Sequence, residues 1–306
     1  MIHETIGQVG HALIIVSFVT ALLATYAYFR SSQEESLAND WRQTARTLFI
    51  VHLAAVIAVA TTLYIIIYNH YFEYHYAFSH ASKALPIAYI VSCFWEGQEG
   101  SFLLWIFWQA LLGVLLMFRN PKWESPVMTV FALVQTFLTS MILGVIIPGI
   151  ELKIGSSPFL LLREAQPDLP VWSMQPNFIP ADGRGLNPLL QNYWMVIHPP
   201  TLFLGFALTL VPFAFLIAGL WKKQLTEWIT PALPWSLFGG GVLGVGIMMG
   251  AYWAYETLNF GGYWNWDPVE NASFVPWLVW IGAIHTMIAY RNSSSALKTS
   301  IILVIT

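Results

Sequence analysis

The amino-acid sequence predicts an all-α fold, a polytopic bundle of membrane-spanning helices. Of its 306 residues, 57% are hydrophobic and only 9% are charged, whereas soluble domains carry about 25% charged residues. The apolar residues also gather in segments long enough to cross the roughly 30 Å hydrocarbon core of a bilayer. We therefore expect about seven full spans plus the start of another, in a single integral membrane domain over residues 1–306.

The apolar segments justify this expectation one by one. Ile6–Phe29 follows no basic region and is long enough to span, so we interpret it as a retained helix rather than a cleaved signal. Six further spans are predicted at Thr44–Asn69, Ser101–Phe118, Ser125–Ile147, Tyr193–Leu220, Pro231–Glu256 and Pro268–Tyr290.

Two shorter apolar stretches do not fit this pattern. Leu85–Trp95 is too short to cross, and we expect it to lie at the interface or to re-enter the membrane. Leu297–Thr306 begins another apolar run that stops early. We interpret the sequence as the N-terminal part of a longer protein or one piece of a split protein.

The basic residues predict the orientation. Most of the 13 Lys and Arg residues lie in alternate, short connections, and the remaining four are Lys83, Lys153, Arg163 and Arg184. Because cytoplasmic connections are enriched in Lys and Arg, the N-terminus is expected outside. The outer segments are then 71–100, 149–192 and 257–267. The net charge of −3 argues against a nucleic-acid partner, and the lone Cys93 excludes a Cys-x-x-Cys motif in this chain.

The segment from Asn259 to Asn271 is the most informative stretch. Asp267 is placed as the N-cap of a helix, Pro268 as its first residue, and Glu270 three positions after the cap. This spacing is typical of a capping box. We therefore expect both carboxylates to stabilise a helix end, and we assign no side chain to acid–base catalysis.

The same segment carries a cluster of aromatic side chains beside Gly261 and Gly262. A single interfacial tryptophan is often only a membrane anchor, but a dense cluster can also form a platform for a flat conjugated ligand, through buried apolar area and ring stacking. Both interpretations remain open from the residues alone. The rings concerned are Phe260, Tyr263, Trp264 and Trp266.

His198 is the stronger of two candidate iron ligands. It precedes Pro199 and Pro200, and a residue before proline is disfavoured in the helical region. We expect His198 on a short non-helical turn at the outer surface, level with the tryptophan segment, with a proline starting the next helix. A neutral imidazole there can bind haem iron, or can simply cap the turn.

His285 is the second candidate, well inside the helix predicted to begin at Pro268. Gly282 and Ala289 lie on its face, and the preceding span contains a glycine-rich run over Gly239–Gly250. Small residues leave room for a planar ligand, but they also allow close helix packing.

The other histidines are weaker candidates. His11 and His52 lie within helices, where hydrogen bonding to a neighbouring helix is the commoner role. Four more lie in ends or outer connections and are expected to be solvated, namely His3, His70, His75 and His80.

With these residues in view, the sequence resembles a known family. The segment Gly261–Trp277 is similar to the tryptophan-rich "WWD" signature of the haem-handling membrane proteins of cytochrome c maturation, whose branches are CcmC, the CcsA-type synthases and CcmF. Three further segments resemble CcmF in particular: Trp95–Trp105, Leu186–Gln191 and Ile197–Gly205.

The resemblance implies a cytochrome c haem lyase component of the bacterial inner membrane, with its active face periplasmic. His198 would ligate the haem that is delivered as substrate, and His285 would ligate a resident haem b. Trp264, Trp266 and Asp267 fall in the signature that cradles incoming haem. Phe260 and Tyr263 stand where the family often has tryptophan.

The implied partners are a haem-carrying chaperone of the CcmE type, apocytochrome c with its Cys-x-x-Cys-His segment, and a thiol-reducing CcmH-type subunit. The second histidine of each iron site should lie beyond Thr306. Two alternatives remain: a haem delivery or export protein of the CcmC or CcsA kind without ligase activity, and a membrane transporter or quinone-binding subunit.

Overall fold

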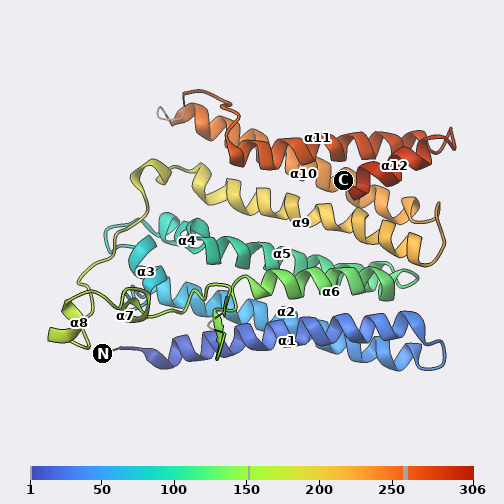
Figure 1. The fold of residues 1–306 in the computed structure, drawn as a ribbon. Helices are drawn as coiled ribbons and strands as arrows, with labels where there is room; N and C mark the ends of the chain where they lie inside the picture. The colour runs from blue at the N-terminus through green and yellow to red at the C-terminus, as the bar shows by residue number, and fades with distance from the viewer. Residues whose placement is uncertain (1, 151, 258–260) are drawn as a thin grey trace. The chain divides into compact units, whose positions relative to one another are not determined.

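The computed structural model describes residues 2–150, 152–257 and 261–306, and it confirms a polytopic helical bundle. Six helices are long and apolar enough to cross a membrane within these residues. They are α1 Glu4–Gln33, α2 Ala38–Tyr68, α5 Gln98–Arg119, α9 Trp194–Trp221, α10 Ile229–Glu256 and α11 Pro268–Ala289 (Figure 1).

The fourth predicted span is shorter than expected. Helix α6, Glu124–Ser140, has 17 residues and ends seven positions before the predicted limit at Ile147. The backbone tightens after it, with Leu143 N donating to Ser140 O, and Gly144 takes a positive φ of 63°. Strand β1, Val145–Ile147, then pairs with β2, Leu152–Ile154, in an antiparallel hairpin. At about 25 Å, α6 is at the lower limit for a span.

The connections contain more short helices than the sequence predicted. The stretch expected at the interface forms the ten-residue α4, Ile87–Glu96. The C-terminal apolar run forms α12, Ala296–Ile305, which packs along α11 (Figure 1). The remaining elements are α3 His75–His80, α7 Leu162–Ala165, α8 Val171–Met174 and the 3₁₀ turn η1 Pro188–Leu190.

The chain divides into two compact units. The first comprises Met1–Leu22, Leu48–Ala110 and Val134–Val196, and the second comprises Leu23–Thr47, Leu111–Leu133 and Ile197–Thr306. In the first unit the two long connections bind each other through their backbones. Leu162 N donates to Glu73 O, and Arg184 N donates to Phe78 O, both over 2.7 Å.

The second unit brings the short basic connections together. Lys122 Nζ lies 2.7 Å from Glu227 Oε2, and Lys222 Nζ donates to Lys122 O over 2.9 Å. Arg46 donates two hydrogen bonds of 2.6 Å to the buried carboxylate of Glu124. The connections after α1, α5 and α9 therefore share one side, as their enrichment in basic residues predicted.

Two of the four histidines expected to be solvated lie beside a carboxylate; the His3 side chain is 44% exposed, as expected, whereas that of His80 is 23% exposed. His3 Nδ1 lies 2.7 Å from Glu73 Oε1, and His80 Nδ1 lies 3.1 Å from Glu96 Oε2. The sequence could not show these pairs, because about 70 residues separate His3 from Glu73.

The start of α9 corrects the prediction for His198. The helix begins at Trp194, so His198 is helical, and Pro199 and Pro200 lie inside the helix rather than at its start. Proline cannot donate the usual bond to the carbonyl four residues earlier. For Pro199 that carbonyl belongs to Met195, and Trp95 Nε1 donates to it over 2.9 Å. This tertiary bond satisfies the group that the proline leaves without a donor, and the helix continues through it.

The glycine-rich helix α10 packs closely on its neighbours, as the packing interpretation of its small residues predicted. A Cβ on Gly239 would stand 2.3 Å from Cη2 of Trp280 in α11. A Cβ on Gly246 would stand 3.1 Å from Cα of Leu202 in α9. Glycine at these positions lets the three helix backbones approach one another.

Candidate functional site

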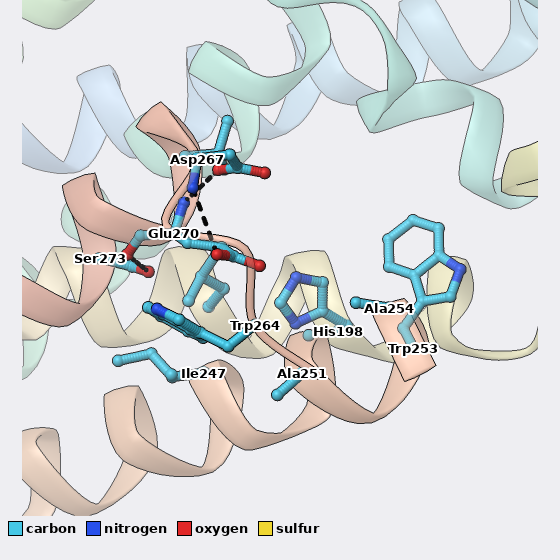
Figure 2. Close-up of a pocket in the computed structure, with 12 residues that line it drawn as sticks. His198, Ile247, Ala251, Trp253, Ala254, Trp264, Asp267, Glu270 and Ser273 are labelled. Atoms are coloured by element: carbon cyan, nitrogen blue, oxygen red, sulfur yellow. Dashed lines mark hydrogen bonds between the residues drawn. The ribbon is translucent and has the colours of Figure 1, made fainter. Parts of the chain in front are cut away.

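A cavity of about 160 Å³ lies where α9, α10 and the start of α11 meet the tryptophan segment. All its lining residues belong to the second unit. Figure 2 shows His198 and Trp264 facing the same space, with Asp267 and Glu270 beside it. Gly250 and Trp253 of α10 also line it.

The imidazole of His198 has one defined hydrogen bond. Its Nδ1 lies 2.9 Å from the carbonyl oxygen of Gly246. A carbonyl can only accept, so Nδ1 carries the proton and the lone pair of the neutral ring is on Nε2. The edge of Trp253 packs against the ring, with centroids 5.9 Å apart at 66°. His198 therefore lines the cavity, and Nε2 is its unprotonated ring nitrogen.

The capping box at the start of α11 is confirmed. Asp267 Oδ1 accepts from Glu270 N over 2.7 Å, and Glu270 Oε2 accepts from Asp267 N over 3.3 Å. Glu270 Oε2 also accepts from Asn265 N over 2.8 Å. Both carboxylates line the cavity, but their bonds to backbone N–H groups give them a structural role, as the spacing predicted.

The structure brings one described aromatic ring of the cluster to the cavity. Trp264 is half-buried there, edge-on to Phe274 at 5.1 Å and to Trp266 at 5.6 Å. Trp266 is 63% exposed and has a positive φ of 57°. Tyr263 is not among the cavity residues. Phe260 lies outside the described residues.

Tyr263 contacts a helix instead of the cavity. Its ring stacks on Tyr255 of α10 with centroids 4.1 Å apart and an angle of 6° between the planes. The stack ties the tryptophan segment to the end of α10. Tyr263 therefore supports the segment, and Trp264 provides its aromatic surface at the cavity.

His285 lies elsewhere on α11 and is exposed. Its Nδ1 is 2.8 Å from the carbonyl oxygen of Ile281, so Nε2 is again the free nitrogen. A Cβ added to Gly282 would meet only Leu303 Cδ1, at 3.5 Å. The imidazole is thus exposed, whereas Leu303 of α12 lies beside Gly282.

The Nδ1 atom of His52 also bonds a backbone carbonyl oxygen, but its ring is buried and no ligand can reach it from outside. Its Nδ1 lies 2.8 Å from Ser17 O, and its Nε2 is buried without a partner among the described residues. His11 lines a second cavity of about 450 Å³, in the first unit, together with Gln8 and the Glu4–Arg163 ion pair. In the described part of the chain no three His, Cys, Asp or Glu side chains could hold a metal together. Each candidate iron ligand is thus a single histidine.

Sequence reasoning missed three residues of the site: Gly246, Gly250 and Trp253. The glycine run was noted, but its spacing did not show which carbonyl would accept from His198. Helical spacing could have suggested the pair, because Gly246 and Gly250 are four residues apart and lie on one face of α10.

Comparisons with known proteins place this chain in a family. The family model described as "Cytochrome C assembly protein" matches residues 95–306. The chain is 38% identical over 217 residues to "Cytochrome c-type biogenesis protein CcmF" of Pseudomonas fluorescens, covering 71% of this chain and 30% of that protein. It is 33% identical over 294 residues to the CcmF of Pseudomonas aeruginosa, covering 92% of this chain and 40% of that protein.

A solved structure agrees with these relatives. "Cytochrome c Heme Lyase CcmF" matches 99% of this chain and 45% of its own length, with a TM-score of 0.75 and 25% sequence identity. The chain therefore spans less than half the length of each of these three proteins. The matched region 95–306 includes His198, the whole tryptophan segment and His285, and the chain belongs to the cytochrome C assembly protein family, within which its relatives are the CcmF proteins.

Proposed function

We propose that this chain is the haem-handling part of a cytochrome c haem lyase. The observation that carries the proposal is the shared cavity of His198 and Trp264, in which an imidazole with a free Nε2 stands beside a half-buried indole. Haem is the substrate with matching chemistry, because its iron takes an imidazole nitrogen and its ring stacks on aromatic side chains.

The size of the cavity supports binding at one edge of the substrate. Its volume of about 160 Å³ is below the roughly 300–1,000 Å³ of pockets that enclose a ligand. A porphyrin bound through His198 would leave much of its ring outside. That arrangement suits the addition of a second reactant to haem, since this reactant must reach the vinyl groups at the ring periphery.

The proposed reaction forms two thioether bonds. In each, the thiol of an apocytochrome Cys-x-x-Cys-His segment adds across a vinyl C=C bond of haem: sulfur bonds to one carbon and the thiol hydrogen goes to the other. Nothing is released, and the addition has no net oxidation or reduction. The contribution of this chain is to hold and orient the substrate rather than to supply acid–base catalysis.

His285 is proposed as one axial ligand of a resident haem b. Its exposed imidazole and its bond to Ile281 O fit such a ligand. When bound, this haem would supply the electron that keeps the substrate iron ferrous.

The location and partners belong to the same proposal. The basic connections between the helices favour the cytoplasmic side, so the tryptophan segment is assigned to the periplasmic face of the bacterial inner membrane. There the protein would meet a CcmE-type haem chaperone, apocytochrome c and a CcmH-type subunit.

The test uses full-length protein with His198→Ala and His285→Ala made separately. We expect both variants to lose cytochrome c maturation and only His285→Ala to lose the b-type absorption spectrum. His70→Ala, in the connection after α2, is the control and should retain both. A full-length protein with no Soret band would favour a transporter, and normal maturation in His198→Ala would refute the assignment of this site.

A further inference from the structure

His198 is placed against α10 by a glycine pair one helical turn apart. Gly246 accepts the Nδ1–H of His198 through its carbonyl oxygen over 2.9 Å. A Cβ on Gly250 would stand 2.8 Å from Cε1 and 3.3 Å from Nε2 of the same ring. The imidazole therefore occupies the space that a side chain at position 250 would fill.

Close helix packing brings the carbonyl within reach of the ring. Gly246 is buried against Leu202, one turn after His198 on α9. Gly205 makes the reciprocal approach, since its Cβ would stand 2.8 Å from Cα of Leu243 in α10. With both glycines at the contact, the α9 and α10 backbones lie close enough for a side chain on one to bond the backbone of the other.

We propose that Gly250 is a positioning residue for His198: by lacking a side chain it lets the ring bond Gly246 O through Nδ1 and present Nε2 to the cavity. The inference rests on the proposed function of the site and extends it to a residue that acts through His198. A hydrogen bond at the far nitrogen fixes both the tautomer and the ring orientation of an imidazole ligand and makes its free nitrogen a stronger donor.

Any side chain at position 250 should displace the imidazole of His198. Cε1 cannot stay 2.8 Å from a Cβ, and Nε2 at 3.3 Å is crowded by it, so the ring must move away from α10. We expect this movement to weaken the bond to Gly246 O and to displace Nε2 from its place in the cavity. Gly250→Ala should therefore mimic the loss of the ligand, although His198 is still present.

The matched control is Gly241→Ala on the same helix. A Cβ at Gly241 meets no atom within 4 Å. The two variants make the same chemical change in α10, but only the Cβ at position 250 contacts the imidazole of His198.

The experiment titrates full-length protein, freed of substrate haem, with iron protoporphyrin IX and records the absorption spectrum. Gly250→Ala should bind at least tenfold more weakly at the His198 site, with loss of the imidazole-ligated spectrum, while Gly241→Ala stays within twofold of wild type. Equal spectra and affinities in the two variants would overturn the proposal. If His198→Ala itself binds haem like wild type, the proposed function has failed rather than the role of Gly250.

A second measurement tests the proposal in protein with native Gly250, so it does not depend on the folding of a Gly250 variant. Nitrogen-15 NMR of histidine-labelled, haem-free protein, with His198→Asn to assign the signal, reports which ring nitrogen carries the proton. We expect the proton on Nδ1. A proton on Nε2 alone would show that Gly246 does not hold the ring, and the proposal would fall.

Discussion

The indole nitrogen of Trp95 donates a hydrogen bond to the carbonyl oxygen of Met195, over 2.9 Å. Pro199 has no N–H for that oxygen, so a side chain replaces the missing backbone donor at the start of α9. We expect Trp95→Phe to leave the carbonyl unsatisfied and to lower stability by about 1–2 kcal/mol. Thermal unfolding in detergent would measure the change.

Trp108→Phe is the matched control for that experiment, because the indole nitrogen of Trp108 is buried without a partner among the described residues. Removing this nitrogen should be neutral or slightly stabilising. An equal loss of stability in the two variants would show that ring volume, rather than the bond to Met195, matters at Trp95.

Breaking the Arg46–Glu124 ion pair should lower the stability of the protein strongly. Both carboxylate oxygens of Glu124 accept from the guanidinium at 2.6 Å, and the Glu124 side chain is fully buried. Glu124→Gln leaves Arg46 facing a neutral amide and should cost about 3 kcal/mol. The exposed pair Lys122–Glu227 provides the control, and Glu227→Gln should cost less than about 1 kcal/mol. Equal midpoints of unfolding for the two variants would contradict this prediction.

Trp264 and Trp266 should differ in their effect on haem affinity. Trp264 lines the cavity, whereas Trp266 does not and is 63% exposed. Trp264→Leu removes ring contact with the bound substrate and should weaken haem binding about tenfold, or about 1.4 kcal/mol. Trp266→Leu should change it less than about threefold, since a loss of 0.6 kcal/mol is expected for a peripheral ring. Haem titration of both full-length variants would decide, and the reverse order would refute the placement of Trp264.

Asp267 allows the structural and chemical roles of a carboxylate to be separated. Asparagine is as good an N-cap as aspartate, but it cannot accept or release a proton at ordinary pH. Asp267→Asn should therefore retain cytochrome c maturation, while Asp267→Ala should lose about 1 kcal/mol of stability and part of its maturation. Maturation assays in membranes with equal protein levels provide the comparison. A complete loss in Asp267→Asn would assign the carboxylate a chemical role.

The sequence predicted the features that depend on residues close together in the chain. The apolar lengths located the helices, and the Asp267–Glu270 spacing located the start of α11, because a capping box is set by residues three positions apart. The approximate place of His198 also followed from the sequence. Its helical conformation did not, because the bond that compensates for Pro199 comes from Trp95, far away in the chain. The ring orientation did not follow from the sequence either, because it depends on a bond to Gly246 O in another helix, and the spacing of glycines within α10 does not show which carbonyl accepts from His198.

Trp266 has a left-handed backbone conformation that lowers the stability of this protein. A bulky residue at a φ of 57° costs about 1–2 kcal/mol that glycine would not, and its exposed ring recovers little of this by burial. Directed selection for heat resistance alone would therefore tend to replace this tryptophan with glycine. Because Trp266 does not line the cavity, this replacement should raise the thermal stability of the protein while leaving haem binding nearly unchanged.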